Sequence, residues 1–340
     1  MRHDKILLPM GAGGLLSQEL MEDVFLPGYG NETLRRMDDA AELNVGDTRL
    51  AFTTDSFTVK PLFFPGGDIG KLAVCGTLND LAVKGAKPLA LSAGFIIEEG
   101  FPVKSLKQIV FSMREAAAGA GVSIVTGDTK VVGRGEADGI YINTSGIGVV
   151  CAGLDISCAR AQVGDSVIIS GTLADHGIAV MNAREKLGFT PEIESDVACV
   201  WKIVEKISVF GAHIHAMRDP TRGGLASVLN EIARASRVNI KIYEALLPVK
   251  EQVLSCCDLL GLDPLYLANE GKAVIIADRS VAGPMLRMLR QMPIGQDAQL
   301  IAEVDGSEYS PEVPPVFLEN AIGTKRFVPM IEGDPLPRIC

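Results

Sequence analysis

Acidic side chains stand at the ends of several apolar, β-rich runs of this sequence. Asp55 closes "LAFTTD", Asp128 closes "SIVTGD", and Asp38 and Asp39 are adjacent in "RRMDDAAE". A single aspartate after a strand usually serves as a turn or cap residue. Three such sites in one half of the chain, together with Asp80 in "TLNDLAV", instead indicate a set of hard oxygen ligands. These carboxylates predict a site for Mg²⁺ bridged to the phosphates of a substrate.

Asp80 carries this hypothesis furthest because of the segment that contains it. The stretch 69–83 is apolar on nearly every side, so we expect a mostly buried helix that Asn79 and Asp80 interrupt. A buried carboxylate is costly unless it is paired or binds a metal, and few lysines or arginines are near in the sequence. Asp80 is therefore a candidate metal ligand, with Asn79 beside it.

Two glycine-containing loops precede expected helices and are candidates for binding phosphate. The first is "MGAGGLLSQEL", whose glycines are Gly11, Gly13 and Gly14, and the second is "RDPTRGGLASVL". Each loop leaves backbone N–H groups at the positive end of a helix. In the second loop, Arg218 and Arg222 add positive charge and Thr221 is expected to cap the helix. Neither loop matches the Walker pattern, which excludes a P-loop.

Two further charged residues are candidate catalytic groups. Lys130 follows Asp128 by two residues in "TGDTKVV", so both side chains should point to the same face of an extended segment. Glu270 lies beside Gly271, directly before an expected buried strand. Each is equally compatible with a solvated charge that flanks a strand. His176, in "DHG" near a helix start, receives no role from the sequence.

The chain contains seven cysteines, and their spacing is irregular. An odd number with no CxxC pair predicts neither a disulfide framework nor a structural zinc site. Cys75, Cys256 and Cys257 lie in apolar helical runs and are expected to be small core residues. Cys340 is the last residue of the sequence, where no later residue can cover it, and a core role does not explain it.

The elements that position these residues predict an α/β (α+β) chain in two related halves. Strands are expected within 49–56, 89–99, 122–132 and 138–150, and helices within 66–86 and 105–121. After residue 153 we expect helices near 175–188, 196–209, 221–236 and 250–261 and strands near 240–243, 273–277 and 299–304. The predicted organisation is a first domain over 1–153, a second domain over 154–329 and a flexible tail over 330–340.

Length and charge limit the class of protein. A chain of 340 residues exceeds the usual size of one core, and 47% hydrophobic residues suffice to fill two. The net charge of −10 opposes general binding to nucleic acid or to an anionic membrane surface. The amino-terminal segment does not resemble a signal peptide, and no apolar run is long enough to span a bilayer. A cytoplasmic location is expected.

In order along the chain, these motifs resemble the HypE family of NiFe-hydrogenase maturation proteins. The resemblance rests on "GAGG", "TTDSFTVKPLFFPGGDIGKLAVCGTLNDLAVKGA", "TGDTKVV", "RDPTRGG", "ANEGK" and the terminal "PRIC". The wider superfamily includes aminoimidazole ribonucleotide synthetase and selenophosphate synthetase. The resemblance implies an ATP-binding fold of two α/β halves and a homodimer formed through the amino-terminal halves.

The resemblance also implies a role for Cys340. A carbamoyltransferase of the HypF type would place a carbamoyl group on its thiol, and ATP would drive dehydration of this thiocarboxamide to a thiocyanate. The cyanide would then pass to iron on a HypC–HypD scaffold. Asp38 or Asp39, Asp55, Asp80 and Asp128 would hold Mg²⁺ and ATP. Lys130 would stabilise charge on the carbamoyl oxygen or the phosphoryl group, and Glu270 would accept a proton.

Two kinds of alternative function remain open at this point. One is a superfamily relative that phosphorylates a free small molecule. A selenophosphate synthetase needs a reactive cysteine near its amino-terminal glycine loop, whereas the first cysteine here is Cys75. An aminoimidazole ribonucleotide synthetase has no use for a terminal thiol. The other alternative is a non-catalytic carrier, against which Asp80 and the strand-end carboxylates argue.

Overall fold

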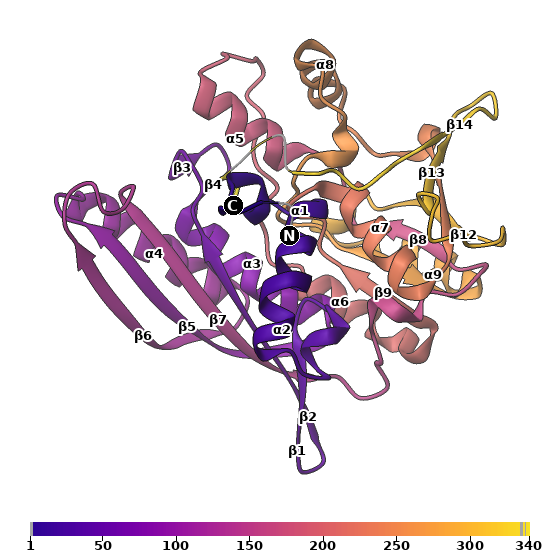
Figure 1. The fold of residues 1–340 in the computed structure, drawn as a ribbon, viewed down its shortest axis with the longest axis horizontal. Coiled ribbons are helices and arrows are strands. Elements are labelled where there is room, and N and C mark those ends of the chain that lie inside the picture. Colours follow the sequence, from indigo (N-terminus) through magenta and orange to yellow (C-terminus); the bar gives the residue numbers. More distant parts are fainter. Residues whose placement is uncertain (1–2, 334–335, 337) are drawn as a thin grey trace.

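The structure, a computed structural model, describes residues 3–333, 336 and 338–340. The chain forms two halves, each built on its own β-sheet, and both marked chain ends lie between the halves (Figure 1). The expected tail over 330–340 includes residues 334, 335 and 337, which lie outside the described residues. Among the described residues, no helix has the length and apolar character that crossing a membrane requires.

The first sheet contains, within the described residues, five strands in the order β1-β2-β7-β5-β6. The strands are β1 (Ala41–Val45), β2 (Thr48–Phe57), β5 (Ala86–Glu98), β6 (Ser123–Val132) and β7 (Ile140–Val150). Neighbours are antiparallel, except that β5 and β6 are parallel. A parallel pair needs a crossover connection, and α4 (Val103–Gly119) provides it. The order leaves β6 at one edge of the sheet, as Figure 1 shows.

Helix α3 (Ile69–Val83) packs against β2, β5 and β7 and positions Asp80. It begins at Asp68, whose Oδ1 accepts hydrogen bonds from the backbone N–H groups of Gly70 (2.8 Å) and Lys71 (2.9 Å). As the sequence predicts, the helix is buried along nearly its whole length. Along β7, buried and less buried residues alternate, so one face of the sheet packs on α3 while the opposite face is left open.

The second sheet has, among the described residues, seven strands in the order β14-β13-β10-β12-β8-β11-β9. They are β8 (Ser166–Ile169), β9 (Ile214–Arg218), β10 (Asn239–Tyr243), β11 (Val274–Ala277), β12 (Gln299–Asp305), β13 (Val316–Glu319) and β14 (Lys325–Phe327). The central strands β8 and β11 are buried on both faces. Val167 and Ile169 join the core under α7, whereas Ile168 joins the core under α6 and α9.

The helices of the second half cover both faces of its sheet and reach the first half. They are α5 (Asp175–Glu185), α6 (Trp201–Ile207), α7 (Gly224–Ser236), α8 (Glu251–Leu260) and α9 (Arg279–Leu289). Residues of α5 and α8 belong to the hydrophobic core that lies on α3, so this core joins the two halves. Cys256 and Cys257 of α8 and Cys75 of α3 are buried there, which confirms that these cysteines are core residues.

Short elements complete the structure near the chain ends. They are α1 (Gly14–Leu20), α2 (Leu26–Tyr29) and the hairpin of β3 (Phe63–Phe64) and β4 (Gly67–Asp68). The backbone N–H groups of Leu15 and Leu16 donate to the carbonyls of Ile331 (2.8 Å) and Glu332 (3.2 Å). The start of α1 therefore contacts the segment that leads to the carboxyl terminus.

Two expected helices begin later than the sequence pattern indicates. The helix expected at 196–209 begins at Trp201, because the segment before it is held by Asn79. Asn79 donates to the carbonyl of Ala198 and accepts from the N–H of Val200. The helix expected at 221–236 begins at Gly224, after Gly223 and Gly224 have adopted positive φ angles of 73° and 61°. Such angles suit glycine. The residues before Gly224, which we expected to be helical, therefore form a turn that leads into the helix.

Candidate active site

A pocket of about 570 Å³ lies where the two halves meet. This volume is in the range of small-molecule sites. Residues around β2 and α3 form one side of it, and the loops after β9 and before β11 form the other. The residues that the sequence predicted for the site and that line this pocket are Asp38, Asp39, Asp55, Asp80, Arg218, Thr221, Arg222, Glu270 and Cys340.

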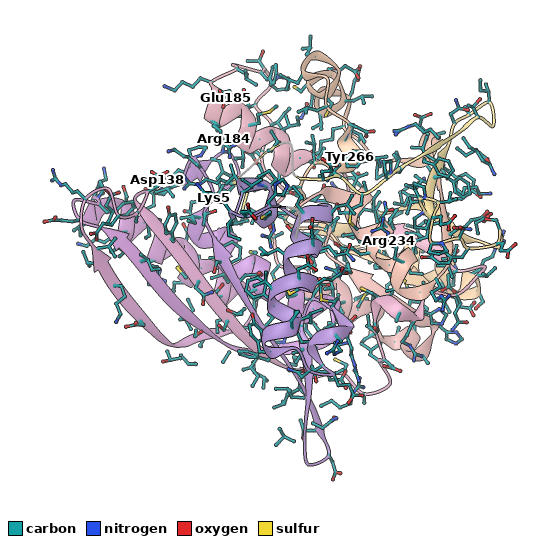
Figure 2. All side chains as sticks on the ribbon, in the orientation of Figure 1. Lys5, Asp138, Arg184, Glu185, Arg234 and Tyr266 are labelled. Atoms are coloured by element: carbon teal, nitrogen blue, oxygen red, sulfur yellow. The ribbon has the colours of Figure 1, made fainter. Side chains whose placement is uncertain are left out.

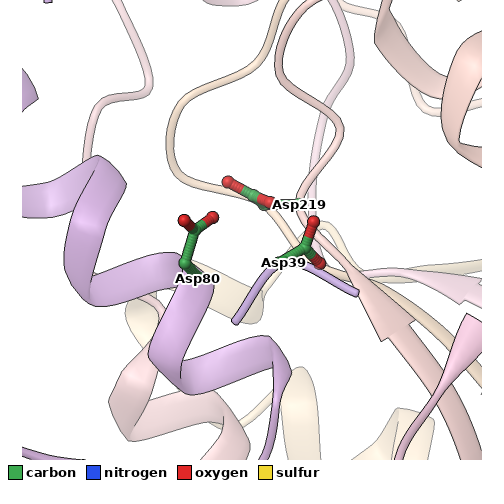
Figure 3. A group of neighbouring side chains, drawn as sticks. All are labelled: Asp39, Asp80 and Asp219. Carbon is green, nitrogen blue, oxygen red and sulfur yellow. The ribbon is translucent and has the colours of Figure 1, made fainter. Parts of the chain in front are cut away.

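Three carboxylates in this pocket approach closely enough to share one cation. Asp80 comes from α3, Asp39 from the segment before β1, and Asp219 from the loop directly after β9 (Figure 3). One oxygen of each lies within 4.8 Å of the others. The Oγ1 of Thr53 on β2 donates to Asp80 Oδ2 over 2.6 Å, which fixes the orientation of that carboxylate.

The protonation of these carboxylates reflects their burial and mutual repulsion. Burial raises the pKa of Asp39 and of Asp80 well above the usual range, and neighbouring aspartates raise both further. Burial also raises the pKa of Asp219 to about 6, although Arg218 opposes the shift. Burial raises the pKa of Asp55 in the same way. A divalent cation would relieve this repulsion, so the donor set fits Mg²⁺.

Asp38 and Asp39 face different surroundings, which the sequence left undecided. Both oxygens of Asp38 are occupied by donors of the protein. Oδ2 lies 2.7 Å from Lys84 Nζ, and Oδ1 accepts from Ser157 Oγ (3.0 Å) and from the N–H of Cys158 (3.1 Å). Asp39 instead belongs to the group of three carboxylates and pairs with Arg218. The geometry therefore favours Asp39 as the ligand and gives Asp38 a structural partner in Lys84.

Arg218 compensates part of the negative charge of the pocket. Its Nη2 lies 2.7 Å from Asp39 Oδ1, and its Nη1 lies 3.1 Å from Glu231 Oε2. The Nε atom is buried and has no hydrogen-bond partner among the described residues. A buried donor without a partner is rare, and here it lies on a guanidinium that lines the pocket. The other nitrogens of the guanidinium are paired with Asp39 and Glu231, so Nε is its unpaired donor among the described residues.

Glu270 is held in the pocket by contacts of its backbone. Its N–H and that of Gly271 donate to the two oxygens of Asp196 over 3.1 and 3.3 Å, and its carbonyl accepts from Asn79 Nδ2 over 3.1 Å. Its Oε1 is buried without a hydrogen-bond partner in the part of the chain that the structure describes. Burial, with Asp219, Asp196 and Asp55, raises the pKa of Glu270 well above its usual value. A carboxylate in this state accepts a proton readily.

Asn79 therefore acts at a different place from the one the sequence suggested. It does not line the pocket but is fully buried behind it, where it binds Ala198, Val200 and Glu270. These hydrogen bonds use its carbonyl and its amide group, so no free donor or acceptor is directed at a nucleotide. Asn79 supports the backbone of Glu270 instead.

Cys340 lines the same pocket as Glu270 and the carboxylates, and Arg222 lies beside it. Both residues also line a smaller adjoining cavity of about 250 Å³. The negative charge of Cys340 is the largest cause that raises the pKa of Arg222. Cys340 carries the terminal carboxylate as well as the thiol, and Arg222 compensates negative charge at this end of the chain. The terminal residue is thus placed in the pocket beside a positive charge.

The two glycine loops do not present free helix ends to the pocket. Gly14 has a φ of 77°, and a Cβ on it would lie 2.3 Å from the carbonyl oxygen of Ile331. Gly14 therefore lets α1 approach the tail, whereas a Cβ on Gly13 would meet Arg222. The carbonyl of Gly11 accepts from Arg222 Nη1 over 2.9 Å. In the second loop, Gly223 rather than Thr221 is the residue before the helix, and no side chain caps it. The expectation that Thr221 caps α7 is wrong.

Asp128 and Lys130 lie outside this pocket. Both are on β6, the edge strand, and their side chains are 71% and 70% exposed. They form an ion pair of 3.1 Å with each other, which confirms that both point to one face of the strand. Since β5 and β7 separate β6 from β2, these residues do not reach the carboxylates of their own chain.

Asp219 is the member of the carboxylate group that sequence reasoning missed. It lies in "MRDPTRGG", directly after β9, so it follows the same pattern of an aspartate at a strand end that identified Asp55. The strand before it was not predicted, because only a short apolar run, "HIHAM", precedes the charged residues. The adjacent arginines drew attention to phosphate binding instead.

Comparisons with known proteins identify relatives of both halves. The family model of the AIR synthase related protein, N-terminal domain, matches residues 37–150, and that of the C-terminal domain matches residues 162–312. The carbamoyl dehydratase HypE of Bradyrhizobium diazoefficiens is 48% identical over 340 residues, which cover 100% of this chain and 97% of that protein.

Two solved structures resemble the whole fold. A HypE–HypF complex contains a chain that is 54% identical, with a TM-score of 0.87 over 92% of this chain and 99% of that one. A hydrogenase maturation protein HypE in complex with ATP is 45% identical, with a TM-score of 0.82 over 99% of this chain and 100% of that one.

Proposed function

This chain belongs to the HypE family of carbamoyl dehydratases, and from that premise we propose that it is an enzyme that uses ATP to dehydrate a carbamoyl group on its own Cys340. The carbamoyl group is carried as a thiocarboxamide and leaves the reaction as a thiocyanate. The observation that carries this proposal is the placement of Cys340, Glu270 and the carboxylate group around one pocket.

The reaction needs a better leaving group than an amide oxygen. The carbamoyl oxygen attacks the γ-phosphorus of ATP, ADP leaves, and one N–H proton departs to give an S-bound imidoyl phosphate. Loss of the second N–H proton with departure of phosphate then forms the C≡N triple bond. Glu270 is placed to accept a proton, because its buried Oε1 lacks a hydrogen-bond partner among the described residues and burial raises the pKa of the carboxyl.

Mg²⁺ and ATP are the groups that the acidic pocket fits. Asp39, Asp80 and Asp219 would hold Mg²⁺, with Asp55 next to Asp80, and the bound ion would neutralise charge on the phosphates. Arg218 and Arg222 contribute the positive charge that such phosphates need. The similar HypE structure that was solved in complex with ATP supports ATP as the nucleotide.

The experiment that tests the reaction is mass spectrometry of the carboxyl-terminal peptide. The protein is incubated with a HypF carbamoyltransferase, carbamoyl phosphate, Mg²⁺ and ATP, and the peptide is then released by a protease. We expect a mass gain of one carbamoyl group less one water. A peptide that keeps the full carbamoyl mass, or gains nothing, would contradict the proposal.

The HypE–HypF complex supports the choice of partner, and we propose a HypC–HypD scaffold as the acceptor of the cyanide.

Asp39 and Asp38 form a matched pair of substitutions for the metal assignment. Asp39→Asn should weaken binding of Mg²⁺ and a slowly hydrolysed ATP analogue about tenfold or more, since a charged ligand is lost. Asp38→Asn should leave the affinity near that of the wild type and lower the unfolding temperature, because Lys84 loses its buried partner. Calorimetry and thermal unfolding measure the two effects. Equal loss of affinity in both variants would remove the distinction between these residues.

The open face of the first sheet supports a homodimer. β6 is an exposed edge strand, and its Lys130 pairs with Ile96 of β5 on the open face. Ile96 of β5, Ile147 of β7 and Phe52 of β2 are exposed on the same sheet. Exposed strands and apolar surface of this kind are usually covered by a partner. We propose a second copy of the chain as that partner, which would place Asp128 and Lys130 at the contact between copies.

A mixing experiment tests whether Lys130 serves the pocket of the partner copy. Lys130→Ala and Asp80→Asn should each abolish dehydration alone. In a co-expressed mixture, a mixed dimer keeps one intact pocket if Lys130 acts across the contact, so roughly a quarter of the wild-type activity should return. A mixture as inactive as either variant would place Lys130 in the reaction of its own copy, and full activity of Lys130→Ala alone would place it outside the reaction.

A further inference from the structure

The end of the chain is bound in a groove next to the pocket. The backbone N–H of Thr58 donates to a terminal oxygen of Cys340 over 3.0 Å, and that of Lys60 donates to the carbonyl of Arg338 over 3.2 Å. Arg338 Nε in turn donates to the carbonyl of Thr58 over 2.9 Å. The main chain at residues 58–60, directly after β2, therefore pairs with the last three residues as a neighbouring strand would.

Side chains add to this binding. Ile339 is 2% exposed and packs in the core on α3. Arg338 forms an ion pair with Asp138, and its carbonyl also accepts from Arg184 Nη2 over 2.7 Å. Asp138 and Arg184 are labelled in Figure 2, near the place where the chain ends. Together these contacts recognise Arg338 and Ile339 and leave Cys340 at the pocket.

His176 binds the remaining carbonyl of this segment. Its ring is fully buried at the start of α5, with Nε2 2.9 Å from the carbonyl oxygen of Ile339 and Nδ1 2.8 Å from Ser195 Oγ. The ring stands edge-on to Phe64, with ring centroids 5.5 Å apart and an interplanar angle of 89°. These contacts allow little rotation of the ring.

The hydrogen bonds determine which nitrogen of His176 carries the proton. Ser195 Oγ accepts from the N–H of Val197 over 3.1 Å, so its own hydroxyl hydrogen is available to His176 Nδ1. Nδ1 is then the acceptor, and the proton lies on Nε2, from which it is donated to the carbonyl of Ile339. Burial lowers the pKa of His176, which favours the neutral ring that this arrangement needs.

We propose that His176 is a positioning residue that holds the peptide group before Cys340 and so keeps the terminal thiol in the reaction pocket. That the position of the thiol matters for a reaction rests on the proposed function. The contacts that bind the tail do not depend on that function. The carbonyl of Ile339 belongs to the peptide bond to which the Cα of Cys340 is attached. With Thr58 on one side of that Cα and His176 on the other, the direction of the side chain is restrained. Without His176, a buried carbonyl loses its donor, and release of the tail satisfies that carbonyl with water.

The direct test is the reactivity of the thiol in the full-length protein without ATP or any partner. Cys340 is alkylated with iodoacetamide, and peptide mass spectrometry follows each cysteine separately. His176→Ala should raise the alkylation rate of Cys340 roughly ten- to hundredfold, as expected for an unpaired buried carbonyl. Cys151, which is partly exposed and does not line this pocket, is the internal control and should not change.

A conservative variant separates positioning from general stability. The amide of His176→Gln can still donate to the carbonyl of Ile339, so it should restore most of the protection of Cys340. Single-turnover dehydration of carbamoylated protein should slow in His176→Ala by a similar factor, with Mg²⁺–ATP affinity unchanged. Unchanged alkylation of Cys340 in His176→Ala, equal alkylation in the alanine and glutamine variants, or a parallel rise at Cys151 would each overturn the proposal. Absence of dehydration in the wild type would contradict the proposed function and leave the alkylation result standing.

Discussion

Cys340→Ala is expected to abolish transfer of the carbamoyl group to this protein while Mg²⁺–ATP binding survives. Among the described residues that line the acidic pocket, Cys340 is the sole cysteine. Burial raises the pKa of Cys158 and of Cys257 to about 12, and burial also raises the pKa of Cys75, so these thiols are poor nucleophiles at neutral pH. Within the described part of the chain, the group of side chains that could hold a metal ion consists of Asp39, Asp80 and Asp219 and does not include Cys340.

The measurement is mass spectrometry of the intact protein after incubation with a HypF carbamoyltransferase, carbamoyl phosphate and ATP. Cys151→Ala is the matched control, since Cys151 is also partly exposed but lies outside the pocket. The control should gain the carbamoyl group at the wild-type rate. A carbamoyl group on Cys340→Ala, or its loss from Cys151→Ala, would show that another thiol is the acceptor and would contradict the proposed reaction.

The periodic elements of the fold were predictable because their patterns are local. Helix α3 is apolar on nearly every side and β7 alternates between its faces, and both lie where the sequence places them. The start of α6 was not predictable in the same way. The segment before it is held by Asn79, a residue more than a hundred positions earlier in the chain, and no local pattern records such a hydrogen bond.

The candidate site was predictable in its residue types and less so in its geometry. Strand ends identified Asp39 and Asp55, and the buried helix identified Asp80. The structure brings all three to one pocket, and the strand-end rule applied to β9 would have found Asp219. Asp38 and Asp39 could not be separated, because the partner that occupies Asp38 is Lys84 on another element. The glycines of the first loop were interpreted as a phosphate-binding turn, whereas Gly14 in the structure makes room for the carbonyl of Ile331 in the tail.

Glu270→Gln is expected to slow dehydration by about 10²–10⁴-fold while Cys340 still accepts the carbamoyl group. Glutamine is nearly isosteric and cannot take a proton at neutral pH. The backbone contacts with Asp196 and Asn79 do not involve the side chain, so the loop should keep its position. Mass spectrometry of the carboxyl-terminal peptide should show the carbamoyl mass accumulating in the variant and the loss of one water in the wild type. Dehydration of the variant at the wild-type rate would remove Glu270 as the base.

The pH dependence of the wild-type rate gives an independent check on this assignment. The base must be ionised, and burial with the carboxylates of Asp219, Asp196 and Asp55 raises the pKa of Glu270 well above its usual value. The single-turnover rate should therefore fall with decreasing pH, and the fall should begin at a higher pH than an exposed glutamate would give. Glu270→Gln should lack that dependence.

The raised pKa of Glu270 also predicts an effect on stability. A raised pKa means that ionising the side chain destabilises the folded state, so this cost is present at neutral pH and decreases as the pH is lowered through that pKa. The glutamine variant should then unfold at the same or a higher temperature than the wild type at pH 8. A lower unfolding temperature would indicate that the ionised side chain stabilises the fold, and would contradict its role as a destabilised, proton-accepting group.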